Sequence, residues 1–228
     1  MIISIHQPQY IPWLGYFDKI IKSDIFIFLD DVQYKKNEWQ NRNKIRNAKN
    51  WQWLTVPVKY RFPQKINEVE IDNSKEWKKD HLLGIINNYS KSEFFKKYID
   101  FFDDLYHKDW KILSDLNIYI IENILKFIGV EIQLLKSSDI CGIIGSGSER
   151  LLSICSWVGA DCYLSGVGGK DYLNVDIFEN NNINVRFQEF LHPQYKQNFG
   201  GFESGMSIID LLFNHGDNSI NILNNKNI

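Results

Sequence analysis

The pattern of apolar and polar positions predicts a strand, a helix and a second strand at the start of the chain. Residues 2–5 form a short apolar run, and residues 25–29 are apolar at every position. Between these runs, large apolar side chains recur at helical spacing: Trp13, Tyr16, Phe17, Ile20 and Ile21. A strand that is apolar throughout is typical of a parallel sheet covered on both faces. We therefore predict a βαβ unit.

Polar residues follow both of these strands. His6 and Gln7 come directly after the first strand, and Asp30 and Asp31 directly after the second. Open α/β proteins bind ligands at the carboxyl ends of their parallel strands. The Pro-containing loop after the first strand is therefore the predicted binding site.

Later apolar patterns extend this unit. Strands are predicted at residues 51–58, 66–71, 132–135, 161–165 and 183–190. Helices are predicted at residues 149–158 and 207–213, and helical spacing runs from Trp77 to Ile128 after Ser74, a predicted helix cap. The basic and amide-rich segment 33–46 is interpreted as a functional loop.

These elements predict an α/β fold with a Rossmann-like, mostly parallel sheet flanked by helices and an inserted helical subdomain. Residues 1–72 are the N-terminal part of the α/β domain with the substrate loops, and residues 73–130 are a helical insertion or lid. Residues 131–215 complete the α/β domain, and residues 216–228 are expected to fray.

Composition narrows the class of protein. With 228 residues and 44% hydrophobic content, the chain can bury a sizeable core. The net charge of −2 argues against a broad basic surface for nucleic acid. Three cysteines without a metal-type pair fit a reducing compartment. Since no leader-like segment or apolar run of about twenty residues is present, we expect a cytoplasmic protein without a membrane span.

Two clusters at strand ends carry ionisable groups. His6 could donate to a phosphate or act as a general base, or simply bond to the backbone. Asp30 and Asp31 could bind Mg²⁺ through its waters, hold a sugar hydroxyl or orient an amine, and a turn or helix cap is the alternative.

The glycine-rich segment after the strand at 161–165 is a candidate for phosphate binding. Gly166, Gly168 and Gly169 let backbone amides approach an anion, and Lys170 would add a positive charge. An ordinary connecting turn is the alternative. His6, Asp30, Asp31 and Lys170 are the catalytic candidates.

Other residues are candidates for substrate binding. Aromatic rings could stack on a base or a sugar, although the spacing of Trp13 and Phe17 favours a core position. Arg42 and Lys44 project to one side if their segment is extended, and a solvated loop face is the alternative. The substrate-binding candidates are Gln7, Tyr10, Trp13, Tyr16, Gln33, Trp39, Asn41, Arg42, Lys44, Ser165, Gly166, Gly168, Gly169, Asp171, Tyr172, His192, Tyr195 and Gln197.

Five motifs, in order along the chain, resemble the WbqC-like family. They are QPQYIPWLGYF at residues 7–17, DDVQY at 30–34, NRNK at 41–44, YLSG at 163–166 and SIIDLLFN at 207–214. Members of this family are typically encoded among bacterial surface-polysaccharide genes, such as those for the O-antigen of lipopolysaccharide. The resemblance therefore implies a role in making or decorating a sugar.

A second, partial resemblance concerns the chemistry. Residues 165–172 are similar to the Gly-x-Lys-Asp-Tyr stretch of pantothenate synthetases, and the N-terminal loop takes the place of the HxGH loop of that nucleotidylyltransferase superfamily. Those enzymes activate a carboxylate with ATP and pass the acyl group to an amine. No second histidine follows Gly15, as HxGH would require.

Three functions fit these features. The first is an ATP-dependent enzyme, using Mg²⁺ but no tightly bound cofactor, that attaches a small acyl or aminoacyl group to the amino group of a nucleotide-linked deoxyamino sugar. The second is a nucleotidylyltransferase or other transferase that acts on a nucleotide sugar. The third is a non-catalytic sugar-nucleotide-binding or scaffold protein. Convergent ionisable groups favour an enzyme. A homodimer is left open.

Overall fold

A computed structural model describes residues 1–224, and the chain divides into two compact units. The first, which we call the sheet unit, contains residues 1–8, 15–31 and 131–191. The second, the helical unit, contains residues 9–14, 32–130 and the segment from His192 onward. The α/β class predicted from the sequence is confirmed, because the sheet unit is built on a five-stranded parallel sheet.

The sheet has the strand order β7-β2-β1-β8-β9. Its strands are β1 (Ile2–His6), β2 (Ile25–Phe28), β7 (Gln133–Lys136), β8 (Cys162–Ser165) and β9 (Asn184–Phe187). All four neighbouring pairs are parallel, so every strand ends at the same edge. The predicted βαβ unit is β1, α1 (Leu14–Ile21) and β2.

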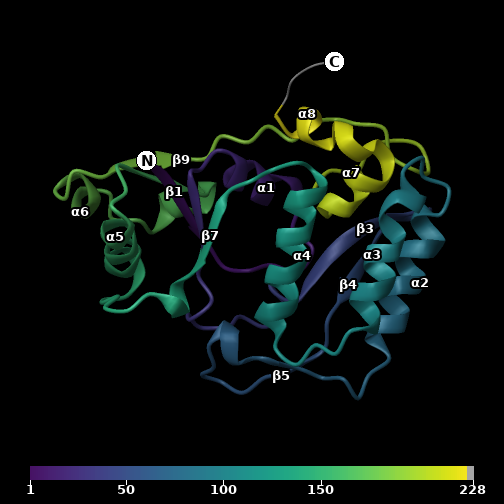
Figure 1. Ribbon diagram of the computed structural model, residues 1–228, viewed down its shortest axis with the longest axis horizontal. Coiled ribbons are helices and arrows are strands. Elements are labelled where there is room, and N and C mark those ends of the chain that lie inside the picture. The colour runs from purple at the N-terminus through teal and green to yellow at the C-terminus, as the bar shows by residue number, and fades with distance from the viewer. Residues whose placement is uncertain (225–228) are drawn as a thin grey trace. The chain divides into compact units, whose positions relative to one another are not determined.

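Helices cover both faces of this sheet (Figure 1). Ile3 and Ile5 of β1 pack in one apolar cluster with Ile154 of α5 (Gly147–Val158) and Phe178 of α6 (Asp176–Glu179). On the other face, the Phe26 ring meets Tyr16 of α1 at a centroid distance of 5.4 Å. Burial on both faces explains why β2 is apolar at every position.

The helical unit combines helices with two antiparallel hairpins. Its helices are α2 (Trp77–Tyr89), α3 (Phe95–His107), α4 (Leu113–Phe127), α7 (Ile208–His215) and α8 (Ser219–Leu223). The hairpins are β3 (Arg42–Asn47) with β4 (Asn50–Thr55), and β5 (Val58–Lys59) with β6 (Glu70–Ile71). Helices α2 and α3 run side by side (Figure 1). The predicted insertion, residues 73–130, lies within this unit.

Several local predictions were wrong. The segment 33–46 is not a loop throughout, because residues 42–47 form strand β3. Ser74 does not cap α2; its hydroxyl donates to Asp72, and α2 follows Glu76 without a side-chain cap. The segment 66–71 is a 3-10 turn, η1 (Ile66–Glu68), followed by the two-residue strand β6.

The glycine-rich segment and the C-terminal segment from residue 216 contain more helical structure than the sequence predicted. The glycine-rich segment forms a 3-10 helix, η3 (Val167–Asp171). The segment that was expected to fray contains the 3-10 turn η4 (Gly216–Asn218) and helix α8. Its last four residues, 225–228, lie outside the described residues.

Candidate active site at the carboxyl edge of the sheet

The sheet brings two distant segments of the sequence to neighbouring strand ends. β1 and β8 pair in parallel register, with Ile2 opposite Cys162 and Ile3 opposite Tyr163. His6 therefore ends β1 at the same edge where Gly166 follows β8. This is the edge at which open α/β proteins bind ligands.

Lys19 of α1 is a buried cation at this edge that the sequence analysis did not identify. Its side chain is 2% exposed, and its Nζ donates to the carbonyl oxygen of Ile5 over 3.2 Å. A Cβ placed on Gly166 would lie 3.9 Å from this Nζ. Within the described part of the chain, no carboxylate pairs with Lys19.

Burial lowers the pKa of Lys19 from its ordinary value of 10.5 to about 7. Within the described residues, the ammonium form of Lys19 is thus buried without a carboxylate to balance its charge. An anionic ligand would supply the missing negative charge, and it would raise the pKa of Lys19 again. The structure thus places a buried cation without a carboxylate partner at the edge where β1 and β8 end.

His6 is positioned as a neutral hydrogen-bond acceptor. Its Nδ1 lies 3.1 Å from the carbonyl oxygen of Gln7, and because a carbonyl only accepts, Nδ1 carries the proton. Burial, and then the charge of Lys19, lower the pKa of His6 to about 3. The neutral ring keeps a lone pair on Nε2. It can accept a proton or a hydrogen bond there, but it cannot donate to a phosphate from that atom.

Tyr16 fixes this histidine and its loop. The Tyr16 ring meets the His6 ring edge-on at 4.9 Å, and the Tyr16 hydroxyl donates to the carbonyl oxygen of Gln7 over 3.2 Å. Tyr16 is 2% exposed, so its ring does not form a stacking surface for a ligand.

The glycine segment is tightly fitted at one position and open at another. A Cβ on Gly169 would overlap the Ser165 hydroxyl and lie 3.4 Å from the Phe187 ring, whereas a Cβ on Gly168 would meet nothing within 4 Å. Lys170 is exposed, and its Nζ lies 5.6 Å from the centroid of the Phe187 ring. Asp171 and Tyr172 are also exposed.

Asp30 and Asp31 connect the ends of β2 and β7. Asp30, which is 2% exposed, accepts bonds from the Ser138 amide at 3.0 Å and the Ser138 hydroxyl at 2.7 Å. Asp31 accepts from the Ser137 hydroxyl at 2.6 Å and is ion-paired with Arg150. Burial raises the pKa of Asp31, but these two partners outweigh it and hold the pKa below its ordinary value.

This arrangement does not fit a resident Mg²⁺ site. Both oxygens of each carboxylate already accept bonds from protein donors, and the Arg150 guanidinium would repel a second cation. No group of three or more His, Cys, Asp or Glu side chains suited to a metal occurs within residues 1–224.

These bonds predict a structural effect for Asp30. We expect Asp30→Ala to lower the free energy of unfolding by about 3 kcal/mol, because it leaves buried serine donors without their acceptor. Urea unfolding at neutral pH measures this change, with Asp100→Ala, at an exposed position of α3, as the control. Wild-type stability with turnover lost would assign Asp30 a catalytic role instead.

Many of the other candidates belong to the helical unit, and several are buried in its hydrogen-bond networks. The Tyr10 hydroxyl lies 2.8 Å from His81 Nδ1 and 2.7 Å from the Tyr106 hydroxyl, and its ring is fully buried. Asn41 donates to the Val56 carbonyl over 3.0 Å. Tyr10 therefore offers no stacking surface, and Asn41 links the residues that flank β3 and β4.

The C-terminal candidates are held in a similar way. The Tyr195 hydroxyl donates to Asp210 over 3.0 Å, and Gln197 donates to the Glu203 carbonyl over 2.9 Å. His192 Nε2 accepts from the Gly205 amide at 3.1 Å.

The remaining candidates of the helical unit are less buried. Trp13 is half-buried, and Gln33 is exposed and donates to the Tyr60 hydroxyl at 3.2 Å. Trp39, Arg42 and Lys44 face solvent fully or in part.

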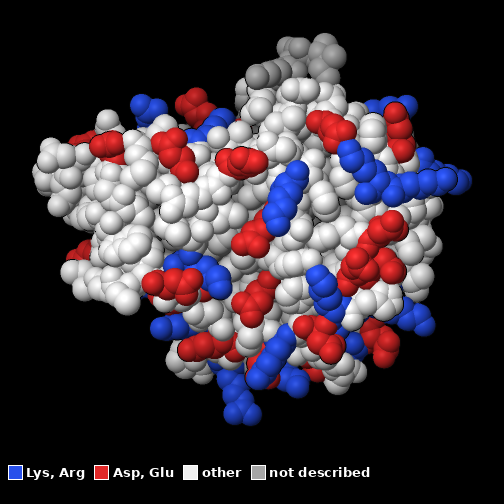
Figure 2. Space-filling model, viewed as in Figure 1, with Lys and Arg blue, Asp and Glu red and all other residues white. Residues whose placement is uncertain are grey.

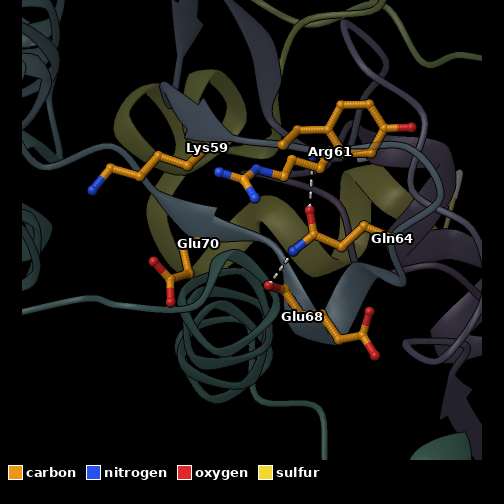
Figure 3. Close-up of a pocket in the computed structure, with 6 residues that line it drawn as sticks. Lys59, Arg61, Gln64, Glu68 and Glu70 are labelled. Carbon is orange, nitrogen blue, oxygen red and sulfur yellow. Dashed lines mark hydrogen bonds between the residues drawn. The ribbon is translucent and has the colours of Figure 1, made fainter.

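A pocket of about 370 Å³ opens in the helical unit beside β5 and β6 (Figure 3). Gln64 orders it by accepting from the Arg61 amide and donating to the Glu68 carbonyl. The charged lining is balanced, with Lys59 and Arg61 against Glu68 and Glu70. It contains none of the residues predicted for the site, and its balanced charge points to no particular ligand.

Charges of both signs are interspersed on the face of the molecule shown in Figure 2. Among residues 1–224, none of the helices combines the length and the apolar character that a membrane span requires.

Sequence reasoning missed Lys19, Ser137, Ser138 and Arg150. The sequence could have indicated the burial of Lys19, because this residue lies three positions after Tyr16 and so shares the buried side of α1. The others come from segments more than 100 residues away from the aspartates that they contact, and no local pattern indicates such a pairing.

Comparison with known proteins identifies a family and a relative but no solved structure. The model of the WbqC-like protein family matches residues 7–222. The Mycobacterium tuberculosis protein Rv1507c, which is named as uncharacterized, is 38% identical over 218 residues, covering 94% of this chain and 94% of the relative. No solved structure matches significantly.

Proposed function

Because this chain belongs to the WbqC-like protein family, we propose that it is an enzyme of polysaccharide-related biosynthesis that attaches an acyl or aminoacyl group to a nucleotide-linked deoxyamino sugar. Family membership supports the role in polysaccharide-related biosynthesis. The observation that carries the reaction is the buried, uncompensated Lys19 beside His6 and the glycine segment. These groups suit an anionic substrate that reacts with an amine.

The proposed reaction has two steps. A carboxylate oxygen of the acyl donor attacks the α-phosphorus of ATP, which enters with Mg²⁺ on its phosphates, and pyrophosphate leaves. The sugar amine then attacks the acyl carbon, the bond to AMP breaks with its electron pair on AMP, and the amine releases a proton to water. Negative charge on the α-phosphate is the main electrostatic demand of the first step.

The residues of the sheet edge have distinct roles in this proposal. Lys19 holds the α-phosphate in its ammonium form, and backbone amides of the glycine segment with Lys170 hold the outgoing pyrophosphate. His6 Nε2 accepts a hydrogen bond from the sugar amine and orients its lone pair toward the acyl carbon. No step requires Asp30 or Asp31 to bind a metal.

The direct test is product formation. The protein is incubated with ATP, Mg²⁺, a panel of amino acids and several amino-sugar nucleotides, and mass spectrometry follows AMP and a sugar adduct. We expect both products. The formation of AMP should require the amino sugar and the amino acid together. Pyrophosphate release without an adduct would favour a nucleotidylyltransferase, and binding without turnover would favour a non-catalytic protein.

Lys170 provides a prediction within the same assay. We expect Lys170→Ala to lower kcat/KM by about a hundredfold, because it removes one cation from the charge that develops on phosphate. Lys126→Ala, at an exposed position of α4 in the helical unit, is the charge-matched control and should keep wild-type activity. Full activity of Lys170→Ala would remove this lysine from the mechanism.

A further inference from the structure

The outer face of the β3–β4 hairpin carries cations and indole rings side by side, and we call it the Trp–cation face. It consists of Trp39, Arg42, Lys44, Trp51 and Trp53. Lys44 lies opposite Trp53 in the antiparallel register, so both side chains project from the same side of the hairpin. Asn43 and Ile45 alternate with them and are buried on the other side.

The cations of this face are held by rings rather than by carboxylates. The Arg42 guanidinium carbon lies 4.4 Å from the centroid of the Trp53 ring. Lys44 Nζ lies 4.1 Å from the centroid of Trp51 and 5.3 Å from that of Trp53. In the described chain, neither Arg42 nor Lys44 forms an ion pair with an acidic side chain. Their positive charge is fixed in place and still available to an external anion.

Two of the three indoles are exposed, and Trp53 is half-buried between them. Trp39 is 38% exposed and Trp51 is 37% exposed. The rings of Trp39 and Trp53 lie 5.6 Å apart, and those of Trp51 and Trp53 lie 5.4 Å apart, so the three rings form one continuous apolar surface. Exposed aromatic surface beside fixed cations matches a ligand with a flat or pyranose ring and a negative group.

We propose that the Trp–cation face is a second binding site, which takes the ring of a sugar phosphate or a nucleotide on its indoles and the phosphate on Arg42 and Lys44. A phosphate satisfies both uncompensated cations, and a ring covers the exposed indole surface. The site is built by the hairpin and by Trp39 of the segment before it, all within the helical unit. It does not depend on the reaction proposed for the sheet edge.

The experiment locates binding on the face itself. The chain has seven tryptophans, and incorporation of 5-fluorotryptophan gives each a fluorine signal that single Trp→Phe variants assign. The full-length protein is titrated with uridine monophosphate, glucose 1-phosphate, uridine, glucose and inorganic phosphate. We expect the signals of Trp51 and Trp53 to move with one or both phosphorylated rings, while Trp157, an exposed residue of α5, stays in place. Comparison of the two phosphorylated rings distinguishes a nucleotide from a sugar phosphate.

Matched variants test the two halves of the site. Lys44→Gln should weaken binding of the preferred phosphorylated ring by about tenfold, because it removes a charge-assisted contact. Lys49→Gln removes one charge from the exposed turn of the same hairpin and should leave affinity within about twofold. Trp51→Leu should weaken binding by about tenfold through lost stacking. Both affected variants should keep the far-ultraviolet circular dichroism spectrum of the wild type.

Several results would overturn this proposal. One is a set of fluorine shifts that inorganic phosphate produces as strongly as the phosphorylated rings do. A second is a shift that depends on protein concentration and not on ligand, because a second copy of the chain would then cover the face. A third is equal weakening by Lys44→Gln and Lys49→Gln. Activity at the sheet edge does not enter these measurements, so the two proposals can fail separately.

Discussion

Replacing Lys19 by methionine should lower turnover by about a thousandfold and at the same time stabilise the protein. Turnover falls because the α-phosphate loses the cation that neutralises it in the transition state. Stability rises because methionine fills the same buried volume in α1 without a desolvated charge. A buried charge that lowers stability is expected at a functional site more often than elsewhere in the fold. The two changes are measured by steady-state kinetics and by urea unfolding.

Lys22→Met is the matched control, because Lys22 lies one turn further along the same chain segment. Its side chain is 47% exposed and it is paired with Asp18. We expect this variant to keep turnover and to change the free energy of unfolding by less than about 1 kcal/mol. If both variants lost activity equally, general damage to α1 would explain the loss and Lys19 would have no special role.

The stability gain of Lys19→Met should depend on pH in one direction. In the unfolded chain Lys19 titrates near 10.5, and in the folded protein near 7. Between these values the unfolded state binds more protons, so the stability of the wild type rises with pH relative to the variant. Each pKa unit is worth about 1.4 kcal/mol, so the gain is largest below pH 7 and declines toward pH 10.5. A gain that did not change with pH would mean that the folded lysine titrates normally.

Gly169→Ala should have the second-largest effect. The added methyl group would overlap the Ser165 hydroxyl and lie 3.2 Å from the Ser165 Cβ, so the hydroxyl must rotate away and η3 must shift by a few tenths of an ångström from the end of β8. We expect about a hundredfold loss of turnover from displacing the phosphate-binding amides, and about 1–3 kcal/mol of lost stability from the strain. Kinetics and urea unfolding measure the two effects.

Gly168→Ala is the adjacent control for this substitution. Its Cβ would meet no atom within 4 Å, and its backbone is not in the left-handed region. We expect wild-type turnover and equal or slightly higher stability, since alanine restricts the unfolded chain. Equal loss of turnover in both variants would show that the flexibility of the whole segment matters, and not the close approach of Gly169 to Ser165.

The sequence predicted the sheet better than it predicted the rest of the molecule. β2 and β8 are apolar at almost every position, and a run of this kind has few alternatives to a buried parallel strand. β3 escaped detection because its sequence, RNKIRN, is polar on both sides. Asn43 faces the core as a bonded amide, and Arg42 and Lys44 lie on tryptophans that the partner strand supplies. Only the pairing with β4 makes this segment a strand.

The candidate site was predicted in outline but not in detail. Strand-end positions of His6 and Gly166 follow from the order of strands and helices, which sequence patterns can reveal. The state of each side chain depends instead on its neighbours in space. Nothing local indicates that Lys19 lacks a counter-ion, or that Ser138 and Arg150 engage Asp30 and Asp31 from distant segments.

The most direct test of the proposed phosphate binding by Lys19 is the pKa of Lys19 itself. In protein labelled with ¹³C-lysine, the Cε signal of Lys19, assigned by its absence in Lys19→Met, is titrated with and without ATP and Mg²⁺. The account predicts a pKa of about 7 in the free protein and a clear rise on nucleotide binding, because the phosphate stabilises the ammonium form. A pKa near the ordinary value of 10.5 that ATP leaves unchanged would contradict it.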